Sequence, residues 1–206
     1  MSRSLGVASL VPGKKIDAAA EQALLEQVRR QDLDAFSKIV DAYQSRIFGF
    51  VKRMVRSEED ALDISQEVFV RAFQAVDRFD GRSGLRTWLF RIAHNLCVDR
   101  ARRSERMPVS VSLEPAEGEE GQRDVADARW NPETVVLREE LQAVVEEALA
   151  SMSEKLRTVL LLHDKEDMGY EEISKTVDVP VGTVKSRLFL ARAHLQDHVG
   201  RYLAKG

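Results

Sequence analysis

Hydrophobic residues recur along most of this chain at intervals of three and four positions, the spacing that places side chains on one face of an α-helix. No segment shows the alternation of apolar and polar residues that is typical of a half-buried strand, and no internal repeat or glycine-rich phosphate loop is found. The pattern therefore predicts an all-α protein. The expected helices cover residues 17–30, 32–56, 58–77, 84–104, 132–150, 153–163, 170–177 and 181–199.

Two of the expected helices begin with recognisable start signals. Ser57 precedes three acidic residues, a pattern that resembles a capping box and places the acids at the positive end of the helix. Pro132 follows Asn131, and proline suits the first helical position because no N–H donor is needed there. These signals indicate where the helices over 58–77 and 132–150 begin.

The helical pattern is interrupted over residues 106–133, "RMPVSVSLEPAEGEEGQRDVADARWNPE", which contain three prolines, two glycines and many acids. Such a segment has too few apolar residues to compensate for the entropy of ordering it, and its charges favour extension. We therefore predict two small helical domains, over 17–105 and 132–203, joined by a flexible acidic linker over 106–131. Trp130 is expected to anchor the linker on the second domain, and residues 1–16 to form a disordered tail.

The overall composition narrows the class of protein. Of the 206 residues, 44% are hydrophobic and 32% charged, so the chain can bury a core beneath a heavily charged surface. No apolar run reaches the roughly 18–20 residues that a membrane span needs. The first residues also lack the apolar core of a signal peptide, so we expect a cytoplasmic protein without membrane insertion. The single cysteine, Cys97, excludes an internal disulfide framework and a cysteine-based zinc site.

The net charge of −3 hides an uneven distribution along the chain. Residues 78–106 carry eight Lys and Arg against three Asp and Glu, and residues 180–206 carry five against one, whereas the segment between them is acidic. Because local charge determines where a polyanion binds, the two basic segments are candidates for nucleic-acid contact. Ordinary solvated helix faces explain the charge alone equally well.

The second basic segment has the construction of a helix-turn-helix. A short helix ends at a turn through Asp178 and Pro180, and the proline together with the small Gly182 suits a sharp connection to a second helix. The buried face of that second helix is expected to consist of Val184, Leu188, Ala191 and Leu195.

The opposite face of this helix combines hydroxyl, cationic and apolar side chains. Short polar side chains can reach base edges in the major groove while flanking cations meet phosphates. A plain helical hairpin with a solvated face is the alternative. The residues of this face are Thr183, Lys185, Ser186, Arg187, Phe189, Leu190, Arg192 and Ala193.

The first basic segment, "GLRTWLFRIAHNLCVDRARR", places a tryptophan and several arginines on one expected helix. Aromatic rings stack on unpaired bases and guanidinium groups hold the backbone, so the face that carries them favours partly single-stranded DNA. For the tryptophan, partial burial against a neighbouring helix is the alternative. The expected core face consists of Leu89, Phe90, Ala93, Leu96 and Cys97, and the opposite face of Trp88, Arg91, His94, Asn95 and Arg102.

A glycine-containing loop, "RFDGRSGLR", precedes this helix. Glycine permits backbone conformations that other residues rarely adopt, so such a loop can form a pocket for an extruded base. We therefore expect the loop and the helix to act on the same strand of DNA.

The helix expected over 58–77 carries an acidic stripe, Asp60, Asp63 and Glu67, with Gln66 alongside. Acids on one face repel DNA and favour a basic protein partner. A solvated acidic face is one alternative, and a metal-dependent nuclease is another, because nucleases also need clustered carboxylates. A nuclease is disfavoured because ligands from elsewhere in the chain do not converge on this face.

Three segments together resemble a known family. "DALDISQEVFVRAF", "GLRTWLFRIAHNLCVDRARR" and "YEEISKTVDVPVGTVKSRLFLARAHL", in this order and spacing, are similar to segments of the extracytoplasmic-function (ECF) sigma factors of bacteria, two-domain members of the sigma-70 family. The resemblance extends from about residue 20 to residue 200. It implies an all-α fold in which a region 2-like bundle precedes a region 4-like helix-turn-helix.

The resemblance also implies partners and contact residues. The acidic helix would dock on the β′ clamp helices of RNA polymerase core, with the β flap as a further contact, and the linker would thread near the RNA exit channel. The residues implied for the polymerase are Asp60, Asp63, Gln66 and Glu67. Those implied for the minus-ten element and its melted non-template strand are Asp80, Arg82, Ser83, Arg86, Trp88, Arg91, His94, Asn95 and Arg102. Those implied for the duplex minus-thirty-five element are Thr183, Lys185, Ser186, Arg187 and Phe189.

On this interpretation the protein initiates transcription at specific promoters, as part of a stress response, and is controlled by an anti-sigma factor. It has no catalytic activity of its own and no cofactor or metal. Leu190 departs from the family pattern, because many members carry a basic residue there. A stand-alone helix-turn-helix regulator would need neither the acidic stripe nor the aromatic and basic helix. A nuclease lacks a third ligand beside His194 and His198, which we interpret as surface or helix-terminal residues.

Overall fold

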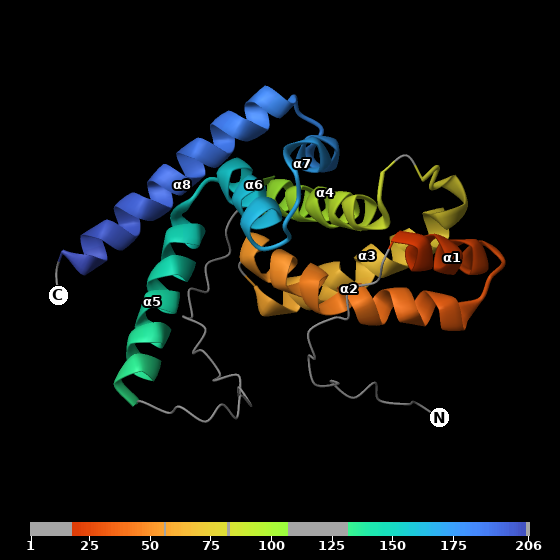
Figure 1. Ribbon diagram of the computed structural model, residues 1–206, viewed down its shortest axis with the longest axis horizontal. Helices are drawn as coiled ribbons and strands as arrows, with labels where there is room; N and C mark the ends of the chain where they lie inside the picture. The colour runs from red at the N-terminus through yellow and green to blue at the C-terminus, as the bar shows by residue number, and fades with distance from the viewer. Residues whose placement is uncertain (1–17, 56, 82, 107–131, 205–206) are drawn as a thin grey trace.

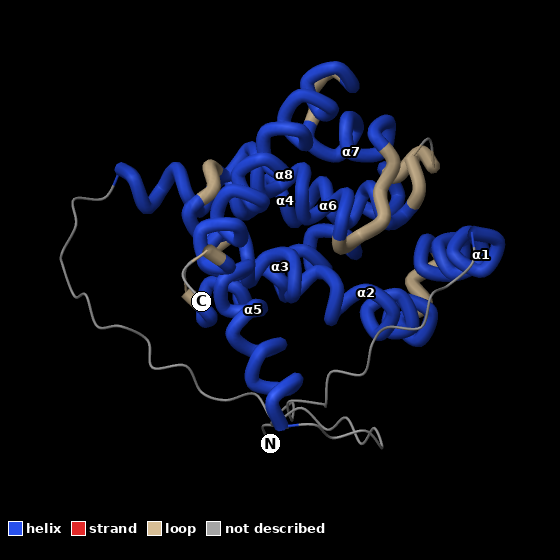
Figure 2. The backbone as a smooth tube through the Cα atoms, turned by 60° about the vertical axis from the view of Figure 1, so that its left-hand side comes forward, coloured by secondary structure: helices blue, strands red, loops and turns tan. Residues whose placement is uncertain are grey.

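The computed structural model describes residues 18–55, 57–81, 83–106 and 132–204, and the predicted tail, most of the linker and Trp130 lie outside these ranges. The described residues form helices and loops without a strand, which confirms the predicted all-α class (Figure 2). The helices are α1 (Ala18–Arg29), α2 (Leu33–Met54), α3 (Glu58–Ala75), the 3-10 turn η1 (Val76–Arg78), α4 (Leu85–Arg106), α5 (Pro132–Ser151), α6 (Glu154–Asp164), α7 (Tyr170–Val177) and α8 (Val181–Leu203).

Helices α1–α4 form an N-terminal bundle around α2 and α4. Ile39, Ile47 and Phe50 of α2 face Leu89 and Phe90 of α4 within one core, and each of these side chains is at most 3% exposed. The Phe50 and Phe90 rings meet edge to face with centroids 5.4 Å apart. Burial of such apolar surface is the main force that holds the bundle together.

Local signals set the starts of the helices, and the one at Ser57 was predicted. The Ser57 hydroxyl accepts a hydrogen bond from the Asp60 backbone N–H at 3.3 Å at the start of α3. Asp32 caps α2 in the same way, through the backbone N–H groups of Asp34 and Ala35 at 3.0 and 3.1 Å. Each such cap satisfies donors that the first helical turn leaves free.

Helices α5–α8 form a C-terminal bundle in which α8 packs against α5 and α6. Val184, Leu188 and Ala191 are buried on one side of α8, as the sequence predicts, whereas Leu195, predicted on the same side, is half-buried. The helix runs to Leu203, four residues beyond its predicted end. The reason is packing against α5, where the Tyr202 hydroxyl donates to Glu140 at 2.9 Å.

The two bundles pack against each other. Figure 1 shows α4 between the layer of α2 and α3 and the C-terminal bundle, where it contacts α7, while α2 contacts α6. Buried residues of both bundles belong to one continuous core. None of the described helices is long and apolar enough to cross a membrane.

Candidate nucleic-acid interface

Helices α7 and α8 form a helix-turn-helix. The turn passes through Asp178, whose backbone adopts the left-handed conformation with φ of 53°, and the Ser174 hydroxyl donates to the Val179 carbonyl at 2.6 Å across it. The carbonyl of Pro180 then accepts from the Val184 backbone N–H at 3.1 Å as α8 begins. The turn therefore fixes the angle at which α8 leaves α7 and presents its first turns to solvent.

The predicted recognition face of α8 is open at Lys185, Ser186 and Phe189, whereas Thr183 and Arg187 are half-buried. Phe189 is 74% exposed and Leu190 54% exposed, an unusual position for large apolar side chains without a partner. Lys185 is exposed as well, and its Nζ lies 5.5 Å from the centroid of the Tyr170 ring. Ser186 is exposed and donates to the Thr183 carbonyl at 3.0 Å. Together these residues form a surface with hydroxyl, cationic and apolar groups at the N-terminal half of one helix.

The loop before α4 turns at Gly81, whose φ of 73° is a conformation that favours glycine. Phe79 is buried beside it, and its ring stacks on the Trp88 ring with centroids 4.7 Å apart and planes 29° apart. Trp88 is thus half-buried within its own bundle. Asp80 is exposed and Ser83 is half-buried on the same loop, whereas Arg82 lies outside the described residues.

The predicted DNA-facing side of α4 divides into two parts. Arg91, Asn95 and Arg102 are exposed, as the helical wheel predicts. Arg86 and His94 are half-buried, because the C-terminal bundle covers them.

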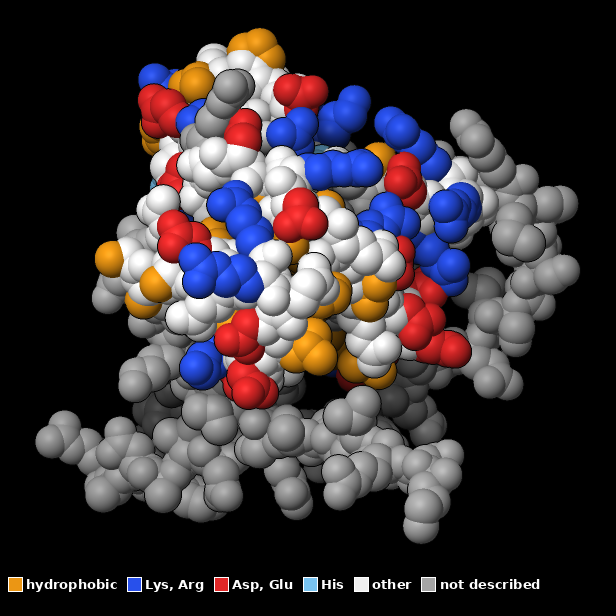
Figure 3. Space-filling view, turned by 90° about the vertical axis from the view of Figure 1, so that its right-hand side faces the viewer, with side chains coloured by type: hydrophobic (Ala, Val, Ile, Leu, Met, Phe, Trp, Pro, Cys, Tyr) orange, Lys and Arg blue, Asp and Glu red, His pale blue; other side chains and the backbone are white. Residues whose placement is uncertain are grey.

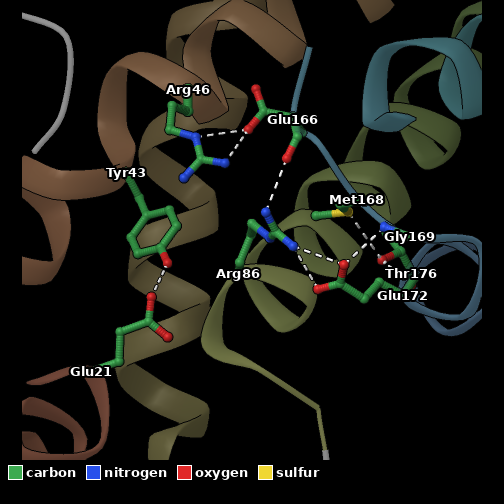
Figure 4. Close-up of polar contacts among 9 residues, drawn as sticks. All are labelled: Glu21, Tyr43, Arg46, Arg86, Glu166, Met168, Gly169, Glu172 and Thr176. Carbon is green, nitrogen blue, oxygen red and sulfur yellow. Dashed lines mark hydrogen bonds and ion pairs between the residues drawn. The ribbon is translucent and has the colours of Figure 1, made fainter. Parts of the chain in front are cut away.

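Arg86 is bound by the C-terminal bundle (Figure 4). Its Nη2 donates to the two carboxylate oxygens of Glu172 at 2.6 and 2.8 Å, and its Nη1 donates to the backbone carbonyl of Glu166 at 3.0 Å. Burial acts to raise the pKa of Glu172, but the hydrogen bonds from Arg86 and from the Gly169 backbone N–H outweigh it, and the pKa lies below its usual value. Glu172 therefore stays ionised and keeps Arg86 in place.

His94 lies at the same interface, close to Arg187 of α8. Burial, with the nearby guanidinium charge of Arg187, lowers the pKa of His94 to about 4. Its Nδ1 atom is buried and has no hydrogen-bond partner within the described part of the chain. Residues predicted for two different promoter elements therefore face each other in this structure.

The acidic stripe of α3 is only partly free. Asp60 forms an ion pair with Arg100 of α4, with Arg100 Nε 3.0 Å from a carboxylate oxygen, and Glu67 accepts from Arg71 at 2.7 Å. Asp63 and Gln66 are exposed, and the apolar Leu62 and Val70 of the same helix are 49% and 48% exposed. An apolar and acidic surface of this kind suits a protein partner better than it suits DNA.

Sequence comparison identifies the family. Residues 39–107 match Sigma-70 region 2, and residues 142–195 match Sigma-70, region 4. The chain is 40% identical to the RNA polymerase sigma-H factor of Pseudomonas aeruginosa, over 84% of this chain and 90% of that protein. It is 37% identical to the ECF RNA polymerase sigma-E factor of Escherichia coli strain K12, over 87% and 94%. The chain belongs to the ECF sigma factors.

Solved structures share the fold of this sigma factor. CnrH, solved in complex with the cytosolic domain of CnrY, matches with a TM-score of 0.65 at 24% identity and covers 88% of this chain and 98% of that one. The sigma factor RpoE of Bartonella quintana, solved with the anti-sigma factor NepR, matches with a TM-score of 0.59 at 23% identity, over 80% and 96%. In this sigma factor, region 2 corresponds to the N-terminal bundle and region 4 to the C-terminal one.

Charged side chains are gathered unevenly on the surface of the sigma factor. On the face drawn in Figure 3, Lys and Arg side chains collect toward the upper right, and a group of Asp and Glu side chains lies below them at the edge. Separate basic and acidic areas fit a protein that meets both a polyanion and a protein partner.

Several residues of the region 2–region 4 interface were not identified from the sequence, among them Arg46, Glu166 and Glu172. Arg46 donates from Nε to Glu166 at 2.8 Å, and the Glu166 side chain is only 8% exposed (Figure 4). Glu172, the third, was interpreted only as part of a short helix. The sequence signal for all three is weak, because an Arg or Glu on an amphipathic helix or in a loop is usually solvated.

Proposed function

We propose that this sigma factor directs RNA polymerase core to specific promoters, reading the minus-thirty-five element with α8 and melting the minus-ten element with α4. The observation that carries the proposal is the exposed recognition face of the helix-turn-helix. Phe189 and Lys185 are exposed to solvent on the first turns of α8, the part of a recognition helix that enters the major groove. Lys185 would meet a phosphate, and Phe189 would contact a thymine methyl group or a sugar.

The minus-ten element is assigned to α4 and the loop before it. The exposed Arg91, Asn95 and Arg102 would hold the non-template strand, and the loop around Gly81 would receive a flipped base. Trp88 is stacked on Phe79, so we assign it to supporting the loop as well as to DNA contact. Unpairing costs a few kcal/mol per base step, and stacking at about 1–3 kcal/mol per base can supply that free energy.

The polymerase contact is assigned to α3. Asp63 and Gln66 are exposed between Leu62 and Val70, so this face offers acidic and apolar groups to the β′ clamp helices. Asp60 and Glu67 would also contact the clamp helices, once basic groups of the polymerase replace their present partners, Arg100 and Arg71.

Control by an anti-sigma factor is part of the proposal. One protein with the same fold, RpoE, was solved in complex with an anti-sigma factor. An affinity purification from resting and stressed cells tests this part. Recovery of a further small protein from resting cells supports it, and recovery of core polymerase alone under both conditions contradicts it.

In-vitro transcription with purified core polymerase, over a library of promoter fragments, tests the proposed function. Initiation at a restricted set of fragments, only when the protein is added, is the expected result. Tight binding to duplex DNA without any effect on core polymerase would instead indicate a stand-alone regulator.

A further inference from the structure

We propose that this sigma factor inhibits itself: region 4 docks on region 2 through Glu172 and Glu166, which occupy Arg86 in place of promoter DNA. The inference rests on the proposed function, since it concerns the same DNA-binding face of α4. It assigns to the carboxylate of Glu172, assisted by the backbone carbonyl of Glu166, a role as an internal competitor of the DNA backbone.

The contacts of Arg86 are those that a phosphate would make. A carboxylate with two oxygens in reach of one guanidinium group is the nearest protein equivalent of a phosphate, and both bind arginine by charge-assisted hydrogen bonds. Glu172 supplies that carboxylate, and the Glu166 carbonyl takes a second N–H of Arg86. A DNA strand can reach Arg86 only after these bonds break.

The docked arrangement is also incompatible with simultaneous contact to both promoter elements. His94 of region 2 and Arg187 of region 4 lie close enough for the charge of one to affect the other. The centres of the two elements are separated by about 25 base pairs, or about 85 Å at 3.4 Å per step. The two regions must therefore separate before each can reach its own element.

The interface joins a buried apolar part to a polar, water-accessible edge. Its ion pairs, Arg86–Glu172, Arg46–Glu166 and Arg53–Glu146, are all partly accessible to water on at least one side. A cavity of about 190 Å³ between α2 and α6 lies beside Arg46 and Glu166. Inter-domain interfaces of this mixed kind resemble transient protein–protein interfaces, in which relative domain motion is expected, so region 4 can act as a cover that is removed on activation.

The decisive variant is Glu172→Gln. It removes the charge that holds Arg86 but keeps a side-chain oxygen for the Gly169 backbone N–H, which Glu172 accepts at 2.9 Å at the start of α7. The matched control is Glu171→Gln, which makes the same change of charge at the next residue, where the side chain is exposed. Any general effect of net charge on DNA binding is then common to both variants.

Two measurements on the full chain test the proposal. Spin labels at the exposed positions Lys38→Cys of α2 and Lys175→Cys of α7 report the distance between the regions in the free protein. Fluorescence anisotropy reports the affinity for a single-stranded non-template oligonucleotide, taken from a promoter found by in-vitro transcription. We expect Glu172→Gln to broaden the distance distribution and to bind the oligonucleotide about fivefold more tightly than Glu171→Gln.

The outcomes separate the two proposals. Equal distances and equal affinities for Glu172→Gln and Glu171→Gln would overturn self-inhibition, even if the unmodified protein directs initiation normally. Absence of initiation by the unmodified protein, with a distance distribution that still broadens in Glu172→Gln, would overturn the proposed function and retain the docking of region 4 through Glu172.

Discussion

At the scale of single residues, His94 shows how the surroundings of a side chain change its chemistry. Its ordinary pKa is near 6.5, and burial beside Arg187 lowers the pKa to about 4. The folded protein therefore binds the proton of His94 less readily than the unfolded chain does. Stability contributed by this residue is present above about pH 6.5 and is lost as the pH falls toward 4.

The variant His94→Gln removes this titration. Between pH 7 and pH 5.5 we expect the unmodified protein to lose about 1 kcal/mol of unfolding free energy more than the variant does. Urea unfolding of both proteins at the two pH values measures the difference. If both proteins lose the same unfolding free energy, protonation of His94 does not destabilise the folded state. That result would contradict the lowered pKa of His94.

Among the acids of α3, Asp63 is the one that can be tested alone, because it is exposed while Asp60 and Glu67 are held by arginines. Asp63→Arg should weaken binding to core polymerase by tenfold or more, since a like-charge contact across an interface costs several kcal/mol and about 1.4 kcal/mol is already tenfold. The thermal stability of the free protein should stay unchanged, because Asp63 is exposed. Analytical gel filtration and fluorescence titration with core polymerase measure the effect. Asp41→Arg, the same change of charge on an exposed position of α2, is the control.

At the scale of elements, α8 has two different faces: Val184, Leu188 and Ala191 are buried in the bundle, and the opposite face, which we propose reads DNA, is exposed. Lys185 stands on the exposed face, near the Tyr170 ring. A lysine that neutralises a phosphate releases a counterion, so its loss weakens binding and also flattens the dependence of binding on salt.

Lys185→Ala is therefore expected to lower the slope of log K against log salt by about one for a duplex minus-thirty-five fragment. Anisotropy titrations over a range of salt concentrations give this slope. Lys38→Ala, a change of the same charge on α2, should leave it unaltered. If the unmodified protein, Lys185→Ala and Lys38→Ala all give the same slope, Lys185 does not contact a phosphate.

The helices themselves were predictable, because each is set by local patterns that the chain carries within a few residues. The buried face of α4 with Leu89 and Phe90 follows from helical periodicity, and the start of α3 follows from Ser57. The opposite face of α4 was predicted only in part. Periodicity predicts which side of a helix is polar. It cannot predict that Glu172, which is 86 residues away from Arg86 in the sequence, will cover that side.

At the scale of the whole molecule, regions 2 and 4 share one core and a set of ion pairs. The most buried of these pairs joins Arg46 of α2 to Glu166 in the loop between α6 and α7. Burial raises the pKa of Glu166, and Arg46 opposes that shift. Loss of Arg46 would leave a nearly buried carboxylate without its cation, a situation that destabilises proteins more than loss of a surface ion pair does.

Arg46→Met tests how firmly the two regions are joined. Breaking a fully buried ion pair costs roughly 3–5 kcal/mol, but separation of region 4 would return water to Glu166, so we expect a smaller loss of about 1–3 kcal/mol at pH 7. The loss should shrink toward pH 5, because the carboxyl group of Glu166, with its raised pKa, then takes up a proton in the folded state first. The double variant Arg46→Met with Glu166→Gln should recover most of the stability, since it leaves no unpaired charge. Urea unfolding of the three proteins at both pH values measures these differences. If the loss in Arg46→Met does not depend on pH and is not recovered by Glu166→Gln, the charge of Glu166 is not its cause. Arg46 would then stabilise the protein through its packing on the Tyr43 and Phe90 rings.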